Sequence, residues 1–239
     1  MRSDVKGGGL QPARDCDPDM MAKDAREERL TLSRTRRTEP REVRRSQLID
    51  ATITSIAKHG IGGTTMSTVT EAAGLSIGLV NFHFKSKQNL LEETLTFLAR
   101  EHHEQWRKAC EDAGLSAPEK LLAIVGSHFH PRICTRKKLA VWYAFFGEGR
   151  RRAVYRSLVD DLDRERYDLS TRLCSEIEAE GGYGGLPPHV VARTLEALYD
   201  GIWLNILIYP DRYKRDRAHR QVRAYLALVY PHHFDRPEV

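Results

Sequence analysis

The chain reads RRSQLIDATITSIAKHGIGGTTMSTVTEAAGLSIGLVNFHFKSK from Arg44 to Lys87, and this stretch decides its fold. The pattern predicts short helices separated by sharp turns. In the turn at 74–76, a glycine ends one helix, Leu75 fills the corner, and Ser76 is placed to cap the next helix. Two short helices joined by a tight, glycine-containing turn are the helix-turn-helix signature, whose second helix enters the major groove of DNA. We therefore expect a DNA-reading unit here.

The rest of the chain has helical periodicity only. Leu48, Ile49, Ile53 and Ile56 recur at spacings of three and four, and Gly60 ends that helix. Thr65 can cap a second helix. A third covers about 77–82, a fourth begins near residue 87, and further helices are expected at about 118–129, 137–147, 151–180, 188–208 and 215–229. No strand-like alternation persists, so the predicted fold class is all-α.

The expected domain organisation has four parts. Residues 1–40 have no apolar period and are expected to form a disordered basic arm, 41–88 the DNA-binding domain, 89–230 a second helical domain, and 231–239 a tail. The end of the arm is arginine-rich. Its side chains could lie along DNA phosphates or remain a solvated tail, and the sequence leaves both open. The basic residues concerned are Arg34, Arg36, Arg37, Arg41, Arg44 and Arg45.

Composition is consistent with a protein that binds a polyanion. The chain has 38 basic and 33 acidic residues, a net charge of +5, and 41% hydrophobic residues, enough for a buried core. No apolar run reaches the roughly 18 residues that a membrane span requires, and no secretory segment follows the N-terminus. The four cysteines are scattered without CxxC spacing, and His128 and His130 lack cysteine or acidic neighbours, which disfavours a metal centre. We expect a cytoplasmic protein without cofactor, metal or membrane partner.

The predicted recognition helix offers two kinds of DNA contact. Its exposed face would meet base edges, and Asn81 is the best base reader because its amide can pair bidentately with adenine. Val80 and Phe84 are expected to face the core. The expected groove residues are Ser76, Ile77, Gly78, Asn81 and Phe82. The expected phosphate contacts are Thr65, His83, Lys85 and Lys87.

The same stretch resembles the DNA-binding domain of TetR-family regulators. The shared pattern is G-x-x-x-T-T-x-x-x-V-T-x-x-A-G-L-S-x-G-x-V-N-F-H-F-K-x-K, from Gly60 to Lys87. Thr70 replaces the usual alanine where the first two helices pack. Asn81 replaces the usual tyrosine of the recognition helix, which lends weight to base contact there over phosphate contact.

The resemblance implies a regulatory second half. In TetR-like proteins the C-terminal helices form a ligand pocket and a dimer interface. The segment 192–207 is too apolar for one buried face, and 222–229 offers a second apolar face, so two subunits could build a four-helix interface. The implied partners are a double-stranded DNA operator, a second copy of the chain, and a small-molecule inducer.

Aromatic residues suggest what that inducer is. Tyr199, Asp200 and Trp203 share one face of a predicted helix, and Trp142, Tyr143 and Phe146 cluster on another. Aromatic faces beside a carboxylate suit a quaternary ammonium ion. The segments WYAFF and ALYDGIWLNILI also resemble the choline-responsive, BetI-like branch of the family. The alternative interpretation of these aromatic residues is ordinary core.

Three functions compete on this basis. The leading prediction is a dimeric repressor that leaves its operator when an inducer, such as a quaternary ammonium compound, binds. The second is a DNA-binding protein without a ligand, which would have a closed core between Trp142 and Trp203. The third is a helical enzyme, which the sequence disfavours because no nucleophile lies beside a base and no phosphate loop or metal cluster is present.

Overall fold

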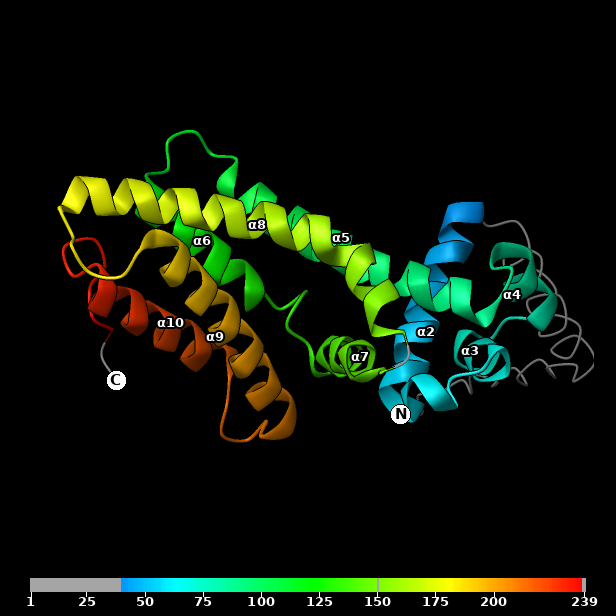
Figure 1. The fold of residues 1–239 in the computed structure, drawn as a ribbon. Coiled ribbons are helices and arrows are strands. Elements are labelled where there is room, and N and C mark those ends of the chain that lie inside the picture. The colour runs from blue at the N-terminus through cyan, green and yellow to red at the C-terminus, as the bar shows by residue number, and fades with distance from the viewer. Residues whose placement is uncertain (1–39, 150, 238–239) are drawn as a thin grey trace, which may run out of the picture. The chain divides into compact units, whose positions relative to one another are not determined.

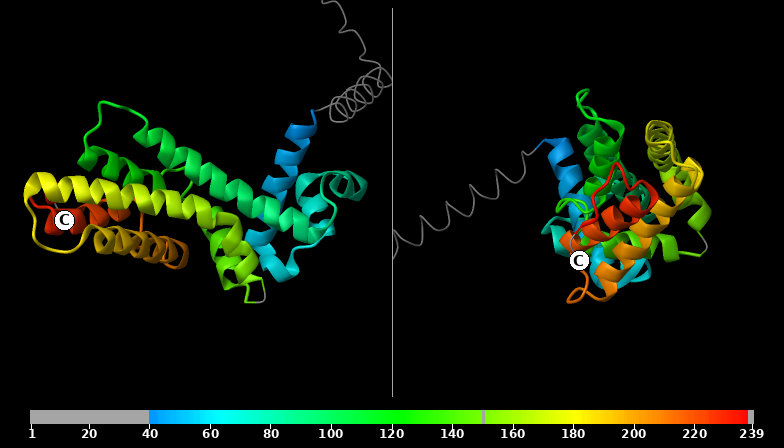
Figure 2. Two further views of the ribbon diagram at one scale, coloured as in Figure 1. Left: turned by 45° about the horizontal axis from the view of Figure 1, so that its top comes forward. Right: turned by 90° about the vertical axis from the view of Figure 1, so that its left-hand side faces the viewer.

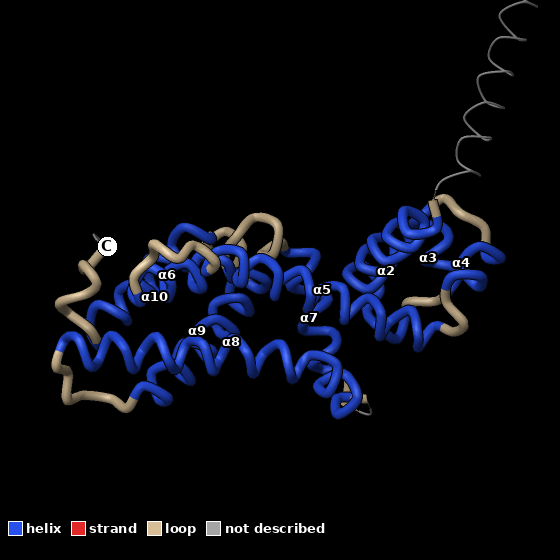
Figure 3. The backbone as a smooth tube through the Cα atoms, turned by 90° about the horizontal axis from the view of Figure 1, so that it is seen from above, coloured by secondary structure: helices blue, strands red, loops and turns tan. Residues whose placement is uncertain are grey.

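The computed structural model describes residues 40–149 and 151–237. The chain divides between Arg44 and Arg45 into two units, the second of which, residues 45–239, contains the packed helices. Every regular element in the described part is a helix, which confirms the predicted all-α class (Figure 3). The predicted arm at 1–39 lies outside the described residues. The predicted division at 88/89 is not tested by this organisation and stays a prediction.

The helices follow the sequence pattern closely. The expected ends of the later helices fall within about two residues of the observed ones, because glycine and proline mark the turns between them. The helices are α2 (Arg41–Gly63), α3 (Met66–Ala73), α4 (Ile77–His83), α5 (Lys87–Cys110), α6 (Ala117–His128), α7 (Arg136–Gly147), α8 (Arg152–Gly181), α9 (Pro188–Ile208) and α10 (Arg215–Val229) (Figure 1).

Two threonines fix the passage from α2 to α3. Gly60 breaks the helical path of α2 with a φ of 69°, and the hydroxyl of Thr64 donates to its carbonyl oxygen at 2.8 Å. Thr65 then caps α3, as predicted. Its hydroxyl oxygen accepts from the Thr68 amide at 3.1 Å, and the Thr68 hydroxyl oxygen accepts from the Thr65 amide at 2.9 Å. This reciprocal capping box satisfies two amides that the helix itself leaves without partners.

The core under α3 and α4 holds these short helices in place. Val69, Val80 and Phe84 are fully buried, as the sequence predicted for the last two. The guanidinium of Arg45 lies 5.0 Å from the centre of the Phe84 ring and pairs with Glu93 of α5 at 2.6 Å. Neither α3 nor α4 is long enough to be stable alone, so they depend on this packing.

The remaining helices pack around α8. This helix runs along α5, α6 and α9, while α7 and α10 both contact α9 (Figures 1 and 2). The core between them contains fully buried aliphatic and aromatic side chains, among them Leu121, Ile124, Leu139, Phe145, Ile177, Val191 and Leu195. None of the described helices combines the length and apolar character needed to cross a bilayer.

Candidate DNA interface and ligand cavity

The turn between α3 and α4 has the geometry of a helix-turn-helix. Gly74 adopts the left-handed conformation with a φ of 63°, and the amides of Gly74 and Leu75 donate to the carbonyls of Glu71 and Thr70. Helix α4 then presents its outer face to solvent. Ile77 and Phe82 are 54% and 69% exposed, large values for apolar side chains. Such exposure suits a surface that another molecule covers.

The structure exposes all the expected groove residues. Ser76, Ile77, Gly78, Asn81 and Phe82 are solvent-accessible around one short helix. Ser76 occupies the N-cap position, but its side chain makes no capping hydrogen bond, so the prediction of a side-chain cap was wrong. Its backbone carbonyl instead accepts from the amides of Leu79 and Val80. The Ser76 hydroxyl is consequently not committed to its own helix.

Of the four expected phosphate contacts, Thr65 and Lys85 are exposed, whereas His83 and Lys87 are not. His83 is only 9% exposed and packs edge-on against Phe82, with ring centres 5.2 Å apart. This burial argues against a phosphate contact. Lys87 is half-buried, and its ammonium donates to the carbonyl oxygen of Ile61 at 2.9 Å and of Gly62 at 3.5 Å. Lys87 therefore joins the end of α2 to the start of α5.

Two glycines of the helix-turn-helix, Gly74 after α3 and Gly78 in α4, allow a matched prediction about stability. Gly74→Ala is expected to lower the free energy of unfolding by roughly 1–2 kcal/mol, because alanine is strained at a positive φ. Gly78→Ala is the control, since Gly78 lies inside α4 and a Cβ there meets no neighbour within 4 Å. It should raise stability by about 0.5–1 kcal/mol and weaken DNA binding through the added methyl group. Urea unfolding measures the stability of each variant, and DNA titration measures its affinity for DNA. If the two substitutions changed stability equally, the requirement for a positive φ at Gly74 would be contradicted.

A half-open cavity of about 110 Å³ lies among α5–α9. An engineered apolar cavity of about 150 Å³ holds benzene, which has six non-hydrogen atoms, so by proportion this volume encloses about four or five such atoms, and a larger ligand would extend through the open side. The lining residues are His102, His128, Trp142, Phe146, Asp163, Arg166, Glu196, Tyr199, Asp200 and Trp203.

The structure brings the two predicted aromatic clusters together. All the expected cage residues except Tyr143 line the cavity. Tyr143 lies beside it, and its hydroxyl donates to the backbone carbonyl of Asp200 at 2.6 Å. This bond ties α7 to α9. The rings of Trp142 and Phe146 stack with centres 5.6 Å apart and an interplanar angle of 26°. Trp142 and Trp203 both line this small cavity, although each side chain is also part of the buried core, with 6% exposure.

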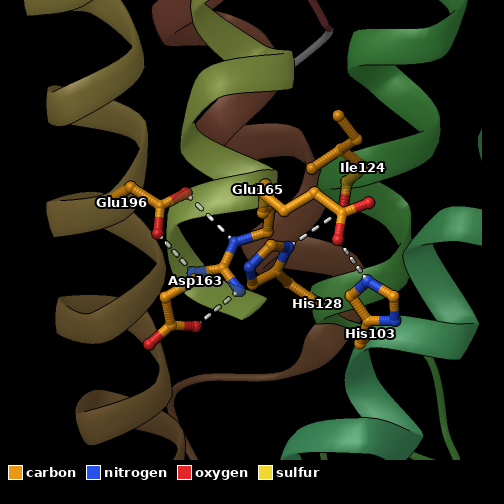
Figure 4. A network of polar contacts seen from close by, with 7 residues as sticks. His103, Ile124, His128, Asp163, Glu165 and Glu196 are labelled. Carbon is orange, nitrogen blue, oxygen red and sulfur yellow. Dashed lines mark hydrogen bonds and ion pairs between the residues drawn. The ribbon is translucent and has the colours of Figure 1, made fainter. Parts of the chain in front are cut away.

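A buried ion cluster forms one wall, and no pattern in the sequence indicated it. Arg166 of α8 is 7% exposed and reaches Glu196 of α9 twice, with Nε–Oε1 at 3.1 Å and Nη2–Oε2 at 2.5 Å (Figure 4). Its Nη1 also donates to Asp163 at 2.9 Å. Burial alone would lower the pKa of Arg166, but the two carboxylates more than offset it, so the guanidinium stays charged. Its positive charge is thus already matched within the wall.

Two neutral histidines form part of the floor. The rings of His102 and His128 meet edge to face, 4.5 Å apart, and His128 stacks on Tyr199 at 3.8 Å. Burial is the main cause that lowers the pKa of both imidazoles well below 6.5. The indole of Trp203 donates to the His128 carbonyl at 3.0 Å, which fixes the ring in the wall. The sequence pointed to His128 only as an unlikely metal ligand. Its role in the cavity floor could not be predicted, because the rings that it contacts belong to other helices.

The carboxyl of Asp200 differs from those paired with Arg166. Asp200 is exposed at the cavity rim, yet the protein atoms around its carboxyl, and secondarily the charge of Glu196, raise its pKa to about 6. Two buried atoms in the wall, Nε2 of His102 and the hydroxyl of Tyr199, have no hydrogen-bond partner in the described structure. Buried polar atoms without partners are rare and call for an explanation. Among the described residues, no group of three metal-ligating side chains is arranged around a common point.

Comparison with known proteins assigns both halves. Residues 48–94 match the model of the bacterial regulatory proteins of the tetR family, and 117–231 match the BetI-type transcriptional repressor C-terminal domain. The HTH-type transcriptional regulator BetI of Paraburkholderia xenovorans is 30% identical over 192 residues, covering 79% of this chain and 94% of the relative. BetI of Burkholderia thailandensis is 34% identical over 195 residues, with the same coverage of 79% and 94%.

Solved structures share the fold. A transcriptional regulator of Pseudomonas aeruginosa PAO1 superposes with a TM-score of 0.70 at 24% identity, covering 81% of this chain and 93% of that one. A regulator of Saccharomonospora viridis, solved in complex with choline, gives a TM-score of 0.66 at 18% identity, covering 76% and 94%. Together with the identity to curated regulators, the helix-turn-helix and the helical second half lead to one conclusion: the chain belongs to the TetR family of transcriptional regulators, in its BetI-like branch.

Proposed function

We propose that the chain is a dimeric repressor that leaves its operator when a small quaternary ammonium compound occupies the cavity between Trp142 and Trp203. The observation that carries this proposal is the charge balance of the cavity wall. Arg166 is matched by Glu196 and Asp163, which leaves the Asp200 carboxylate for a cation from outside. The aromatic faces beside it would meet the alkyl groups of such a cation.

The size and polarity of the cavity support a ligand of the choline class. Choline has seven non-hydrogen atoms, so it would fill a cavity of about 110 Å³ and also occupy its open side or displace part of its wall. Its hydroxyl could pair with Nε2 of His102 or the hydroxyl of Tyr199, two wall atoms that have no hydrogen-bond partner among the described residues. The choline bound to the Saccharomonospora viridis regulator is a precedent for this fold.

A dimer is the assembly we propose. Helices α9 and α10 carry exposed apolar side chains, with Leu204, Ile208 and Leu228 at 40%, 53% and 68% exposure. Pairing these faces across a two-fold axis would bury them. It would also place two α4 helices for paired half-sites on DNA. Because the proposed partner is operator DNA, we also propose the cytoplasm as the location.

The two alternative functions receive less support. A regulator without a ligand would fill the space between α7 and α9 with side chains, whereas this space is a cavity. An enzyme receives no support from the relatives, since the matching family models and the curated BetI proteins are transcriptional regulators. We propose that the chain is not an enzyme.

Asp200→Asn tests the proposal. Two unit charges roughly 6 Å apart at an effective dielectric of about 40 attract by about 1.4 kcal/mol, so choline affinity should fall about tenfold. Calorimetric titration measures this, and release of operator DNA by choline should require correspondingly more ligand. Because the carboxyl pKa is about 6, wild-type affinity should also decline as the pH falls through 6, and the variant should lack this decline.

Two controls separate charge from other effects. Asp168→Asn makes the same change at an exposed position of α8 outside the cavity lining and should leave choline affinity unchanged. The neutral analogue 3,3-dimethylbutan-1-ol should bind weakly and respond to neither variant. If choline and its neutral analogue bound equally well, or if Asp200→Asn had no effect, the cation site would be refuted.

A further inference from the structure

Helix α7 connects the cavity to the DNA-binding half of the chain. It has 12 residues, which at 1.5 Å per residue gives a length of about 18 Å. Trp142 and Phe146, toward its C-terminal end, line the cavity. Its first turn contacts α2, the helix that supports α3 and α4. A helix this short moves as one rigid element, so a displacement at one end is also felt at the other.

The contact with α2 is a solvent-exposed hydrogen bond. The ammonium of Lys137 donates to Oγ1 of Thr54 at 3.3 Å. Thr54 uses its own hydroxyl hydrogen on the Asp50 carbonyl at 2.9 Å, which leaves its oxygen lone pairs for Lys137. The two hydrogen bonds can therefore exist at the same time, with Lys137 donating to Thr54 and Thr54 donating to the Asp50 carbonyl.

The neighbouring charges favour this position of α7. Asp50 of α2 lies near both Lys138 and Lys137, whose charges attract its carboxylate, while burial and the charge of Glu101 raise its pKa. Lys138 is in turn ion-paired with Glu101 of α5 and donates to the Arg132 carbonyl at 2.7 Å. The first turn of α7 thus contacts α2 through Lys137 and α5 through Lys138.

The far end of α7 is held to α9 by a hydrogen bond from the Tyr143 hydroxyl to the backbone carbonyl of Asp200. Trp142 and Phe146, one turn apart on α7, stack on each other and line the cavity. A ligand that enters between these rings and Trp203 has to displace the side chains of α7 or the helix itself, because the cavity is small. Displacement of the helix changes the position of Lys137 relative to Thr54.

We propose that Lys137 is a positioning residue that transmits occupancy of the cavity from α7 to α2 through its hydrogen bond to Thr54. This inference rests on the proposed ligand-responsive function and adds its route. Helix α5 also joins both halves, and the proposal is that α7 provides a second, separable connection. Ligand and DNA binding are then coupled through the Lys137–Thr54 contact without either residue touching ligand or DNA.

The first arm of the test measures the coupling factor, defined as the ratio of DNA Kd values with and without saturating choline. The DNA is a duplex selected by the wild-type protein from a randomised pool. Lys137→Met and Thr54→Val should each reduce this factor by about two- to fivefold, with the choline affinity of the free protein within about twofold of wild type. The coupling factor of the double variant should fall no further than that of either single variant, since both substitutions break the same hydrogen bond. Arg136→Met, at the adjacent exposed position, is the control.

The second arm needs no ligand. Phe146→Ala changes the cavity wall and should change the Kd for DNA. The size of this change should differ by at least about twofold between proteins with lysine and with methionine at position 137. It should be the same with arginine and with methionine at position 136. If the coupling factor and this dependence are both unaffected by Lys137→Met, the proposal is overturned. If instead choline leaves the DNA affinity of the wild type unchanged, the proposed function fails, and the second arm alone decides the role of Lys137.

Discussion

Arg166→Met is expected to lower the free energy of unfolding by about 3–5 kcal/mol, a large loss for a single substitution. The methionine leaves Glu196, whose side chain is 18% exposed, without the guanidinium that pairs with it, and it also removes the partner of Asp163. A buried carboxylate without a partner is costly, whereas the intact cluster contributes little net stability because its formation required desolvation of the Arg166 and Glu196 charges, while the Asp163 side chain stays 52% exposed. Urea unfolding monitored by circular dichroism measures the change.

A matched control lies two residues earlier on the same helix. Arg164 pairs with Asp160 at 2.5 Å and Asp161 at 3.7 Å, but all three side chains are more than half exposed. Arg164→Met should therefore cost at most about 0.5 kcal/mol. Combining Arg166→Met with Glu196→Met should restore part of the lost stability, since the orphaned carboxylate is gone. Equal losses from Arg164→Met and Arg166→Met would show that burial of the cluster is not what makes it sensitive.

Asn81→Ala is expected to weaken binding to the selected operator by about 1–3 kcal/mol, which is roughly 5- to 150-fold. Asn81 is exposed on α4, and its amide is the side chain best able to pair bidentately with an adenine edge. Affinity for random duplex DNA should hardly change, because that binding depends on phosphates. Selection from a randomised pool by the variant should show relaxed preference at one base position.

Lys85→Ala is the informative comparison for this loss. Lys85 is exposed next to α4, so its removal should weaken all sequences alike, while the slope of log affinity against log salt falls by about one. Lys87 is unsuitable for this purpose because its ammonium is bonded to Ile61 and Gly62. If Asn81→Ala and Lys85→Ala weakened specific and random DNA in the same proportion, the separation between base reading and phosphate contact would be wrong.

Local signals carried most of the fold prediction. The capping box at Thr65, the left-handed Gly74 and the 182–187 loop are each determined by a few neighbouring residues, so the helix ends could be placed from the sequence. The Ser76 side chain was mispredicted because occupying the N-cap position does not compel a serine to make the hydrogen bond. Burial of His83 and the bonds of Lys87 depend on tertiary packing and have no local signature.

The cavity was predicted only in part for the same reason. Helical spacing places Tyr199, Asp200 and Trp203 on one face, and the aromatic cluster at 142–146 was visible as composition. Arg166 and Glu196 are 30 residues apart on different helices, and His102 and His128 likewise belong to different helices. Such pairs are recognisable only when the packing of α5, α6, α8 and α9 is known.

The bond between Lys87 and the end of α2 has a mechanical consequence. It joins the first residue of α5 to the end of α2, the helix that packs beside α3 and α4. We therefore expect the start of α5 to move together with these helices. Helix α5 has 24 residues, a lever of about 36 Å at 1.5 Å per residue. A tilt of roughly 5° about its far end would move the near end by about 3 Å, close to the roughly 3.4 Å rise of one base pair. A small angular change of α5 is therefore enough to move α3 and α4 by a distance comparable to one base-pair step.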